Sequence, residues 1–168
     1  MRFYRELTDL PQNVMKKIEE LSEEFELLGF KVNKSEDIIV ISSEDPLKMR
    51  LLESFIKAIE AGYPLEDAFR ILKEEAILER IDVDEYAKKK RAHRQRLIGR
   101  VIGRKGSCKR RIEEFTNTKI LIGKKNIWIL GTEKNVFLAR EIIMELLSGR
   151  THETAFKRGI RKAKSAKV

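Results

Sequence analysis

The sequence predicts an α+β protein with two similar units in tandem, each ordered strand, helix, helix, strand, strand, helix. Three features of its 168 residues support this prediction: an internal repeat, a separation of charge between the two halves of the chain, and a basic, glycine-containing stretch in the second half. Hydrophobic residues make up 42% of the chain, an ordinary share for a protein with a core, so disorder throughout is not expected.

The internal repeat relates residues 37–69 to residues 126–156. Each segment begins with alternating β-branched residues, which predict a strand with one buried face. Apolar residues at helical spacing follow and predict a helix, and both segments then contain the pattern Glu, any residue, Ala, Phe. The helix starts predicted by the capping residues are Asp45 with Pro46 in the first segment and Thr132 in the second, and the predicted ends are Gly62 and Gly149.

The first unit is assigned to residues 1–65. A short strand is predicted at residues 3–4, and Pro11 is predicted to open a helix that Gly29 ends, because apolar residues recur between them at helical spacing. A second strand is predicted at residues 30–32. The repeated strand and helix complete this unit.

The second unit is assigned to residues 66–150, and the remaining residues, 151–168, to a basic C-terminal extension. Residues 76–86 alternate imperfectly and fit either the end of a helix or a first strand. A basic linker, an apolar turn and a glycine loop follow. A helix is then predicted over residues 107–116 and a strand over residues 119–122.

Charge separates the two halves of the chain. Residues 1–85 hold 12 Lys and Arg against 21 Asp and Glu, a formal charge of −9, whereas residues 86–168 hold 24 against 6, a formal charge of +18. A mixed, solvated surface explains the high total of charged residues but not their segregation. A domain-sized segment this basic is typical of a protein that binds a polyanion, because each phosphate contact releases condensed counterions.

Several other classes of protein are excluded. The single cysteine, Cys108, cannot form an internal disulfide, and with only His93 and His152 beside it a four-ligand zinc site cannot be assembled. The histidines lack catalytic partners and the basic half has six scattered acids, so no catalytic residue, cofactor or metal site is expected, apart from loosely bound, oxygen-ligated ions. No run of about 18 apolar residues could span a membrane, and the charged N-terminus is unlike a secretory signal. A cytoplasmic protein is expected.

The glycine loop precedes the helix predicted over residues 107–116. The spacing of Gly99, Gly103 and Gly106 fits neither a dinucleotide fingerprint nor a P-loop, so a nucleotide cofactor is not expected. Glycine at positions 103 and 106 lets the main chain approach phosphates closely, and the N-terminus of the following helix attracts anions. The sequence Gly-Arg-Lys-Gly therefore predicts a phosphate-binding loop.

This loop, with isoleucines spaced on either side of it, resembles the G-x-x-G loop of KH domains, which clamps a short single-stranded segment. The resemblance implies that each unit is a KH unit of type I, in which a three-stranded antiparallel sheet packs on helices. Carried over by motif, it implies that the chain contacts RNA through Arg100, Ile102, Gly103, Arg104, Lys105, Gly106, Ser107, Lys109, Arg110 and Ile120.

Some residues of this region have an alternative interpretation. Ile102, Ile112 and Ile120 are alternatively core residues, and Lys109 alternatively faces solvent. Trp128 alternates with two isoleucines and is expected on the opposite face of the sheet. The C-terminal extension is either a frayed terminus or a helix that touches RNA. Its basic residues are Lys157, Arg158, Arg161, Lys162, Lys164 and Lys167.

The first unit departs from the KH pattern. It has no glycine before Gly29, and five glutamates lie in the stretch from Glu19 to Glu26. So much negative charge opposes an anion clamp. Residues 1–65 are therefore interpreted as a degenerate KH unit that supports the second unit or presents an acidic surface to a protein partner.

The segments GYPLEDAFRIL, NIWILG and LLSGRTHETAF, together with the loop, resemble the KH protein of small-ribosomal-subunit assembly, the partner of the Nob endonuclease in archaea and eukaryotes. The resemblance implies a non-enzymatic assembly factor that binds single-stranded small-subunit ribosomal RNA precursor near its 3′ end and assists its late maturation. The implied partners are this RNA, the Nob endonuclease, an adenosine dimethyltransferase and an initiation-factor subunit, without a cofactor or a membrane. The alternative is a general KH adaptor or regulator that acts on other RNAs.

Overall fold

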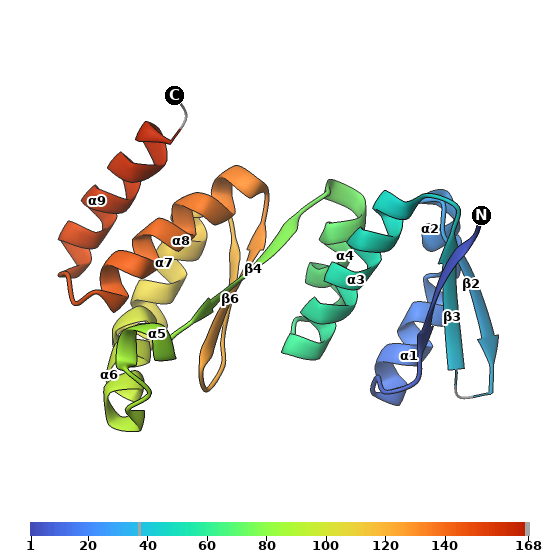
Figure 1. Cartoon of the computed structure of the whole chain (residues 1–168), viewed down its shortest axis with the longest axis horizontal. Helices are drawn as coiled ribbons and strands as arrows, with labels where there is room; N and C mark the ends of the chain where they lie inside the picture. Colours follow the sequence, from blue (N-terminus) through green and yellow to red (C-terminus); the bar gives the residue numbers. More distant parts are fainter. Residues whose placement is uncertain (37, 167–168) are drawn as a thin grey trace. The chain divides into compact units, whose positions relative to one another are not determined.

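The computed structural model describes residues 1–36 and 38–166 of the chain, which Figure 1 shows coloured along the sequence. Residue 37, with which the first repeat segment begins, and Lys167 of the basic C-terminal segment lie outside the described residues. Within the described part, no helix is long and apolar enough to cross a membrane.

Unit 1, residues 1–75, has a three-stranded antiparallel sheet with the strand order β1-β3-β2 and helices packed on it (Figure 1). The helical stripe predicted between Pro11 and Gly29 forms two helices that meet at Leu21. In chain order the elements are β1 (Phe3–Leu7), α1 (Gln12–Glu20), α2 (Ser22–Leu27), β2 (Lys31–Ser35), β3 (Ile38–Ser43), α3 (Pro46–Ala61) and α4 (Leu65–Glu74).

The helix boundaries of the repeat follow the predicted capping residues. The Asp45 side chain accepts a hydrogen bond of 2.8 Å from the backbone N–H of Leu47, which satisfies one free donor at the start of α3. Gly62 ends α3 with a left-handed φ of 107°. In the second repeat segment Thr132 precedes α8 with an extended backbone, and Gly149 follows it with a φ of 89°.

The predicted boundary after residue 65 is wrong, because unit 1 continues to Glu75. Helix α4 packs on α3, and its Phe69 ring lies edge-on to two rings of the unit 1 core. The ring centroids are 5.2 Å from Phe25 and 6.2 Å from Phe55. Edge-to-face contacts of this kind stabilise a core beyond the area that they bury, so α4 is an integral part of unit 1.

Unit 2, residues 76–168, has a second three-stranded antiparallel sheet, with the strand order β4-β6-β5. The ambiguous residues 76–86 form a strand followed by a short helix, and most of the basic linker belongs to a helix. In chain order the elements are β4 (Ile77–Asp82), α5 (Asp84–Ala87), α6 (Arg91–Ile102), the 3₁₀ turn η1 (Arg104–Gly106), α7 (Ser107–Thr116), β5 (Lys119–Ile122), β6 (Asn126–Gly131), α8 (Glu133–Leu147) and α9 (His152–Ser165).

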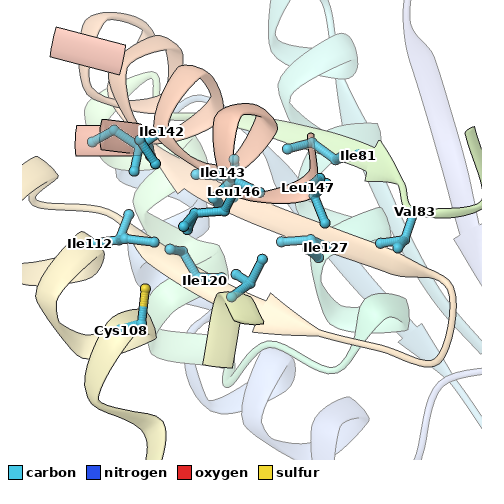
Figure 2. Packing of buried hydrophobic residues seen from close by; sticks show 14 of the residues in the cluster. Ile81, Val83, Cys108, Ile112, Ile120, Ile127, Ile142, Ile143, Leu146 and Leu147 are labelled. Carbon is cyan, nitrogen blue, oxygen red and sulfur yellow. The ribbon is translucent and has the colours of Figure 1, made fainter. Parts of the chain in front are cut away.

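The core of unit 2 lies between its sheet and its helices, and Figure 2 shows isoleucines of the strands and of α7 and α8 pointing toward one another. Ile127 and Ile129 of β6 are fully buried, whereas Trp128 between them is half-buried. Successive side chains of a strand point to opposite faces, so Trp128 lies on the other face of the sheet, as predicted.

The residues after 150 are not a separate extension. Helix α9 lies beside α8 (Figure 1), and its Ala155 and Phe156 are buried in the unit 2 core. A frayed terminus would expose these side chains. The described residues of the C-terminal segment therefore belong to unit 2, because they complete its core.

Candidate nucleic-acid interface

The G-x-x-G loop joins α6 to α7 through backbone conformations that need glycine. Gly103 has a φ of 73° and a ψ of 177°, a combination open almost exclusively to glycine. A Cβ atom there would lie 2.7 Å from both the Cβ and the backbone nitrogen of Cys108. Gly106 has a left-handed backbone, with φ 76° and ψ 12°. The loop therefore presents main chain, without intervening side chains, at both ends.

The loop leads directly into the N-terminus of α7. The first residue of this helix is Ser107, and in the described structure no side chain caps the helix end. Free N–H groups and the helix dipole at such an end favour an anion. Arg104, Lys105, Ser107 and Arg110 are exposed around it. Together the loop and the start of α7 can hold the charged oxygens of a phosphate.

The three isoleucines around the loop differ in burial. Ile112 and Ile120 lie in the unit 2 core (Figure 2), and Ile120 exposes only 3% of its surface. The prediction that the Ile120 side chain contacts RNA is therefore wrong, because core atoms enclose it. Ile102, at the end of α6, is half-buried and is the isoleucine that a base could reach.

Lys109 is half-buried and forms an ion pair within α7. Its ammonium group lies 3.4 Å from the Glu113 carboxylate, one turn further along α7. Glu113 also accepts a hydrogen bond of 2.7 Å from the backbone N–H of Ile120 in the edge strand β5. Sequence reasoning missed Glu113: the four-residue spacing from Lys109 indicates an ion pair, but nothing local indicates the bond to β5.

Arg100 lies near the end of α6, beside the connection between α8 and α9. Its guanidinium donates a hydrogen bond to the carbonyl oxygen of Arg150, and the Nε2 atom of His152 lies 3.1 Å from the carbonyl oxygen of Arg100. His152 must donate here, since a carbonyl oxygen only accepts. The end of α6 next to the loop is thereby fixed to the α8–α9 connection.

Cys108 follows the loop as a packing residue, as the sequence predicted. It is buried, and this burial raises the pKa of its thiol, against the opposing influence of Arg111 and Arg100. The thiol is thus kept neutral rather than reactive. Across residues 1–36 and 38–166, no group of three or more His, Cys, Asp or Glu side chains is arranged to hold a metal ion.

Unit 2 inserts a helix, a G-x-x-G loop and a second helix between the first two strands of a three-stranded sheet, and this arrangement defines a KH domain. A family model of the second KH domain of PNO1, described as "Eukaryotic type KH-domain (KH-domain type I)", matches residues 77–165, more than half of the chain. The chain belongs to this PNO1 family of KH proteins.

Three curated relatives illustrate the family. A KH domain-containing protein of Methanocaldococcus jannaschii is 33% identical over 114 residues, which are 68% of this chain and 50% of that protein. The RNA-binding protein PNO1 of Oryzias latipes is 34% identical over 64% of this chain and 44% of its own length. The pre-rRNA-processing protein PNO1 of Phaeosphaeria nodorum is 31% identical over 64% of this chain and 42% of its own length. The match thus spans half or less of each relative.

Solved structures from archaea resemble almost the whole chain. A protein of unknown function from Aeropyrum pernix has a TM-score of 0.77 at 28% identity, covering 99% of this chain and 94% of its own. Dim2p from Pyrococcus horikoshii has a TM-score of 0.69 at 26% identity, covering 96% and 99%. A complex of a/eIF2alpha, aDim2p and rRNA from the same organism contains a chain that matches with a TM-score of 0.72, covering 98% of this chain and 96% of its own. Because the identity is 23%, this match supports the fold alone.

Proposed function

We propose that this chain is a non-enzymatic RNA-binding factor of small-ribosomal-subunit assembly. Its G-x-x-G loop holds single-stranded precursor ribosomal RNA near the 3′ end, and this binding assists late maturation of that RNA. The observation that carries the proposal is the loop itself: two glycines with positive φ flank Arg104 and Lys105 at the uncapped start of α7.

The chemistry of the loop favours nucleic acid over a cofactor. Main-chain N–H groups and exposed cations recognise phosphate oxygens without reading a base, while the half-buried Ile102 offers an apolar contact to a base. The names of the relatives, an RNA-binding protein and a pre-rRNA-processing protein, support the same substrate.

The same proposal implies where the protein acts and which partners it meets. The factor acts in the cytoplasm beside the Nob endonuclease and an adenosine dimethyltransferase, and it meets an initiation-factor subunit through a protein surface. A solved complex whose aDim2p chain shares the fold of this protein contains a/eIF2alpha and rRNA, and the proposal of the last partner follows that precedent. Unit 1, without a glycine loop, is the proposed site of protein contacts.

The direct test reverses both charges of the loop with Arg104→Asp and Lys105→Asp. Aspartate tolerates the left-handed backbone of position 105, so the fold is retained. We expect affinity for an oligonucleotide from the 3′ end of small-subunit precursor RNA to fall more than tenfold by fluorescence anisotropy. The matched control reverses the exposed pair Lys16 and Lys17 of α1 and keeps the affinity. Unchanged affinity in a folded loop variant overturns the proposal.

Salt dependence measures the number of phosphates held. If the loop contacts four of them, the slope of log affinity against log salt is about −3, since single strands contribute about 0.7 per phosphate. Crosslinking in cells then tells the RNAs apart: reads at the 3′ end of small-subunit RNA support the proposal, whereas reads elsewhere support a general KH adaptor.

A further inference from the structure

A basic groove runs along α6 away from the G-x-x-G loop. One hollow is lined by the loop residues Gly103 and Arg104 together with Arg96, Arg100, Gly149 and His152. A second hollow shares Arg96, Arg100 and Gly149 with the first and extends to Tyr86 and His93. We call this continuous surface the α6 groove and define it by His93, Arg96, Arg100, Arg104, Gly149 and His152.

The cations of the α6 groove are left without carboxylate partners. Arg96 and Arg100 are one turn apart on the same face of α6, and Arg104 follows at the same interval. Among the described residues none of these three arginines forms an ion pair, and no Asp or Glu lines the groove. By contrast, Arg94 on another face of α6 lies 2.6 Å from the Asp84 carboxylate. The helix therefore has one neutralised face and one that is free to attract an anion.

Arg100 adds a donor that lacks an acceptor. Its Nε–H is buried and has no hydrogen-bond partner in the described structure. A buried donor without an acceptor is costly. A ligand in the α6 groove, which Arg100 lines, can supply that acceptor once the Arg100 side chain turns its Nε–H toward the groove, because the atom has no exposed surface in this structure.

Hydrogen bonds hold the two sides of the α6 groove together, and the α6 backbone at Gly99 is open to a ligand. The hydrogen bonds from Arg100 to the carbonyl of Arg150 and from His152 to the carbonyl of Arg100 hold α6 against the α8–α9 connection. At Gly99, which lines the hollow, an added Cβ atom would meet nothing within 4 Å. A ligand can therefore approach the α6 backbone without a rearrangement.

We propose that the α6 groove is a second phosphate track, over which the RNA strand continues after it leaves the G-x-x-G loop. The inference rests on the proposed function, since it concerns the same RNA. Gly103 and Arg104 belong to both the loop and the groove, so one backbone can follow both. Because the groove begins at one side of the loop, it receives nucleotides that extend one end of the core RNA and not the other.

The test uses the full chain and three RNAs: a core of about four nucleotides, the core extended at its 5′ end, and the core extended at its 3′ end. Arg96→Glu removes an exposed cation that has no ion pair among the described residues, so its unfolding midpoint should equal that of the unaltered protein. Lys134→Glu, an equal charge change at the start of α8 and outside the groove, is the matched control.

We expect Arg96→Glu to lower affinity about five- to tenfold for one extended RNA only, and to reduce its salt slope by about 0.7, the contribution of one phosphate. The core RNA and the RNA extended at the other end should bind as before, and Lys134→Glu should bind all three RNAs like the unaltered protein.

Two results overturn the second track: equal binding of all three RNAs by Arg96→Glu and the unaltered protein, or an equal loss for the core and the extended RNAs. Neither result contradicts the proposed function, which is RNA binding by the G-x-x-G loop. That function fails when the double Asp variant of Arg104 and Lys105 keeps its affinity for the core RNA.

Discussion

Lys105 combines a positive charge that favours phosphate binding with a backbone conformation that costs stability. Its backbone is left-handed, with φ 51° and ψ 32°, which costs a residue with a Cβ atom roughly 1–2 kcal/mol. The same conformation places an exposed ammonium group between two glycines at the start of α7. The cost to stability is consistent with a residue kept for binding.

Replacing Lys105 by Asn separates the two effects. Asparagine adopts the left-handed region more readily, so we expect the free energy of unfolding to stay equal or to rise by up to about 1 kcal/mol. RNA affinity should fall severalfold, because one cation at the phosphate site is lost. Urea denaturation and fluorescence anisotropy measure the two quantities. Weaker binding that is accompanied by lower stability would speak against this account.

Helix α9 is the element whose packing depends most on particular residues. Gly159 faces Ile142 of α8 so closely that an added Cβ atom would lie 2.6 Å from the Ile142 side chain and 2.9 Å from its backbone nitrogen. The carboxylate of Glu145, on α8, is buried and lies 2.7 Å from Lys162 and 3.3 Å from Arg158. Close approach and charge pairing together fix α9 on α8.

The pairing of Glu145 makes this contact sensitive to acid. The hydrogen bond from Lys162 lowers the pKa of Glu145 below its ordinary value of 4.5, against the opposing effect of burial. Because the folded-state pKa is the lower one, the contribution to stability is complete above the unfolded-state pKa and is lost as the pH falls through the folded-state pKa.

Glu145→Gln should therefore lower the free energy of unfolding at pH 7 by up to about 1.5–3 kcal/mol, the range for hydrogen bonds to charged groups. The difference between the variant and the unaltered protein should shrink as the pH falls below 4.5. Urea denaturation across this pH range measures it. A difference that stays constant down to the lowest pH would show that the charge of Glu145 is not the cause.

At the scale of the whole molecule, two units with separate sheets and cores carry opposite charge. With the boundary that the structure gives, unit 1 holds 11 Lys and Arg against 17 Asp and Glu, a formal charge of −6, and unit 2 holds 25 against 10, a formal charge of +15. The charge separation predicted from the sequence thus persists with the corrected boundary. Unit 2 alone combines the loop, the α6 groove and the positive charge.

Fragments divided at the structural boundary should therefore differ in function. We expect residues 76–168 to fold and to bind the 3′-end RNA within about threefold of the full chain, since the loop and the α6 groove stay in the fragment and only the weak long-range repulsion from the acidic unit 1 is lost. Residues 1–75 should fold without measurable binding. Circular dichroism and anisotropy decide the point. A folded 76–168 fragment that binds more than tenfold more weakly would place RNA contacts in unit 1.

Interactions between residues close in the chain were largely predictable. The cap at Asp45, the helix end at Gly62 and the loop from Gly103 to Gly106 follow from backbone preferences that act over a few residues. The helix over residues 107–116 and the strand over residues 119–122 also lie where periodicity placed them.

Interactions between distant residues were not predictable in the same way. The boundary after residue 65 failed because the place of Phe69 depends on rings some 14 and 44 residues earlier in the chain. The repeated Glu-x-Ala-Phe pattern did indicate where each unit ends, since it lies in α4 and in α9, which are the equivalent last helices of their units. The bond from Ile120 to Glu113 has no local signature at all.

The sequence by itself determined the duplicated α+β units, the G-x-x-G loop and the basic character of the second half, because composition, periodicity and glycine conformation are local properties. Only the tertiary structure decided that Ile120 is enclosed in the core, that α9 completes unit 2, and that Arg100 lines a groove beside the α8–α9 connection. Burial and charge pairing depend on which distant segments pack together, and packing is a property of the folded chain as a whole.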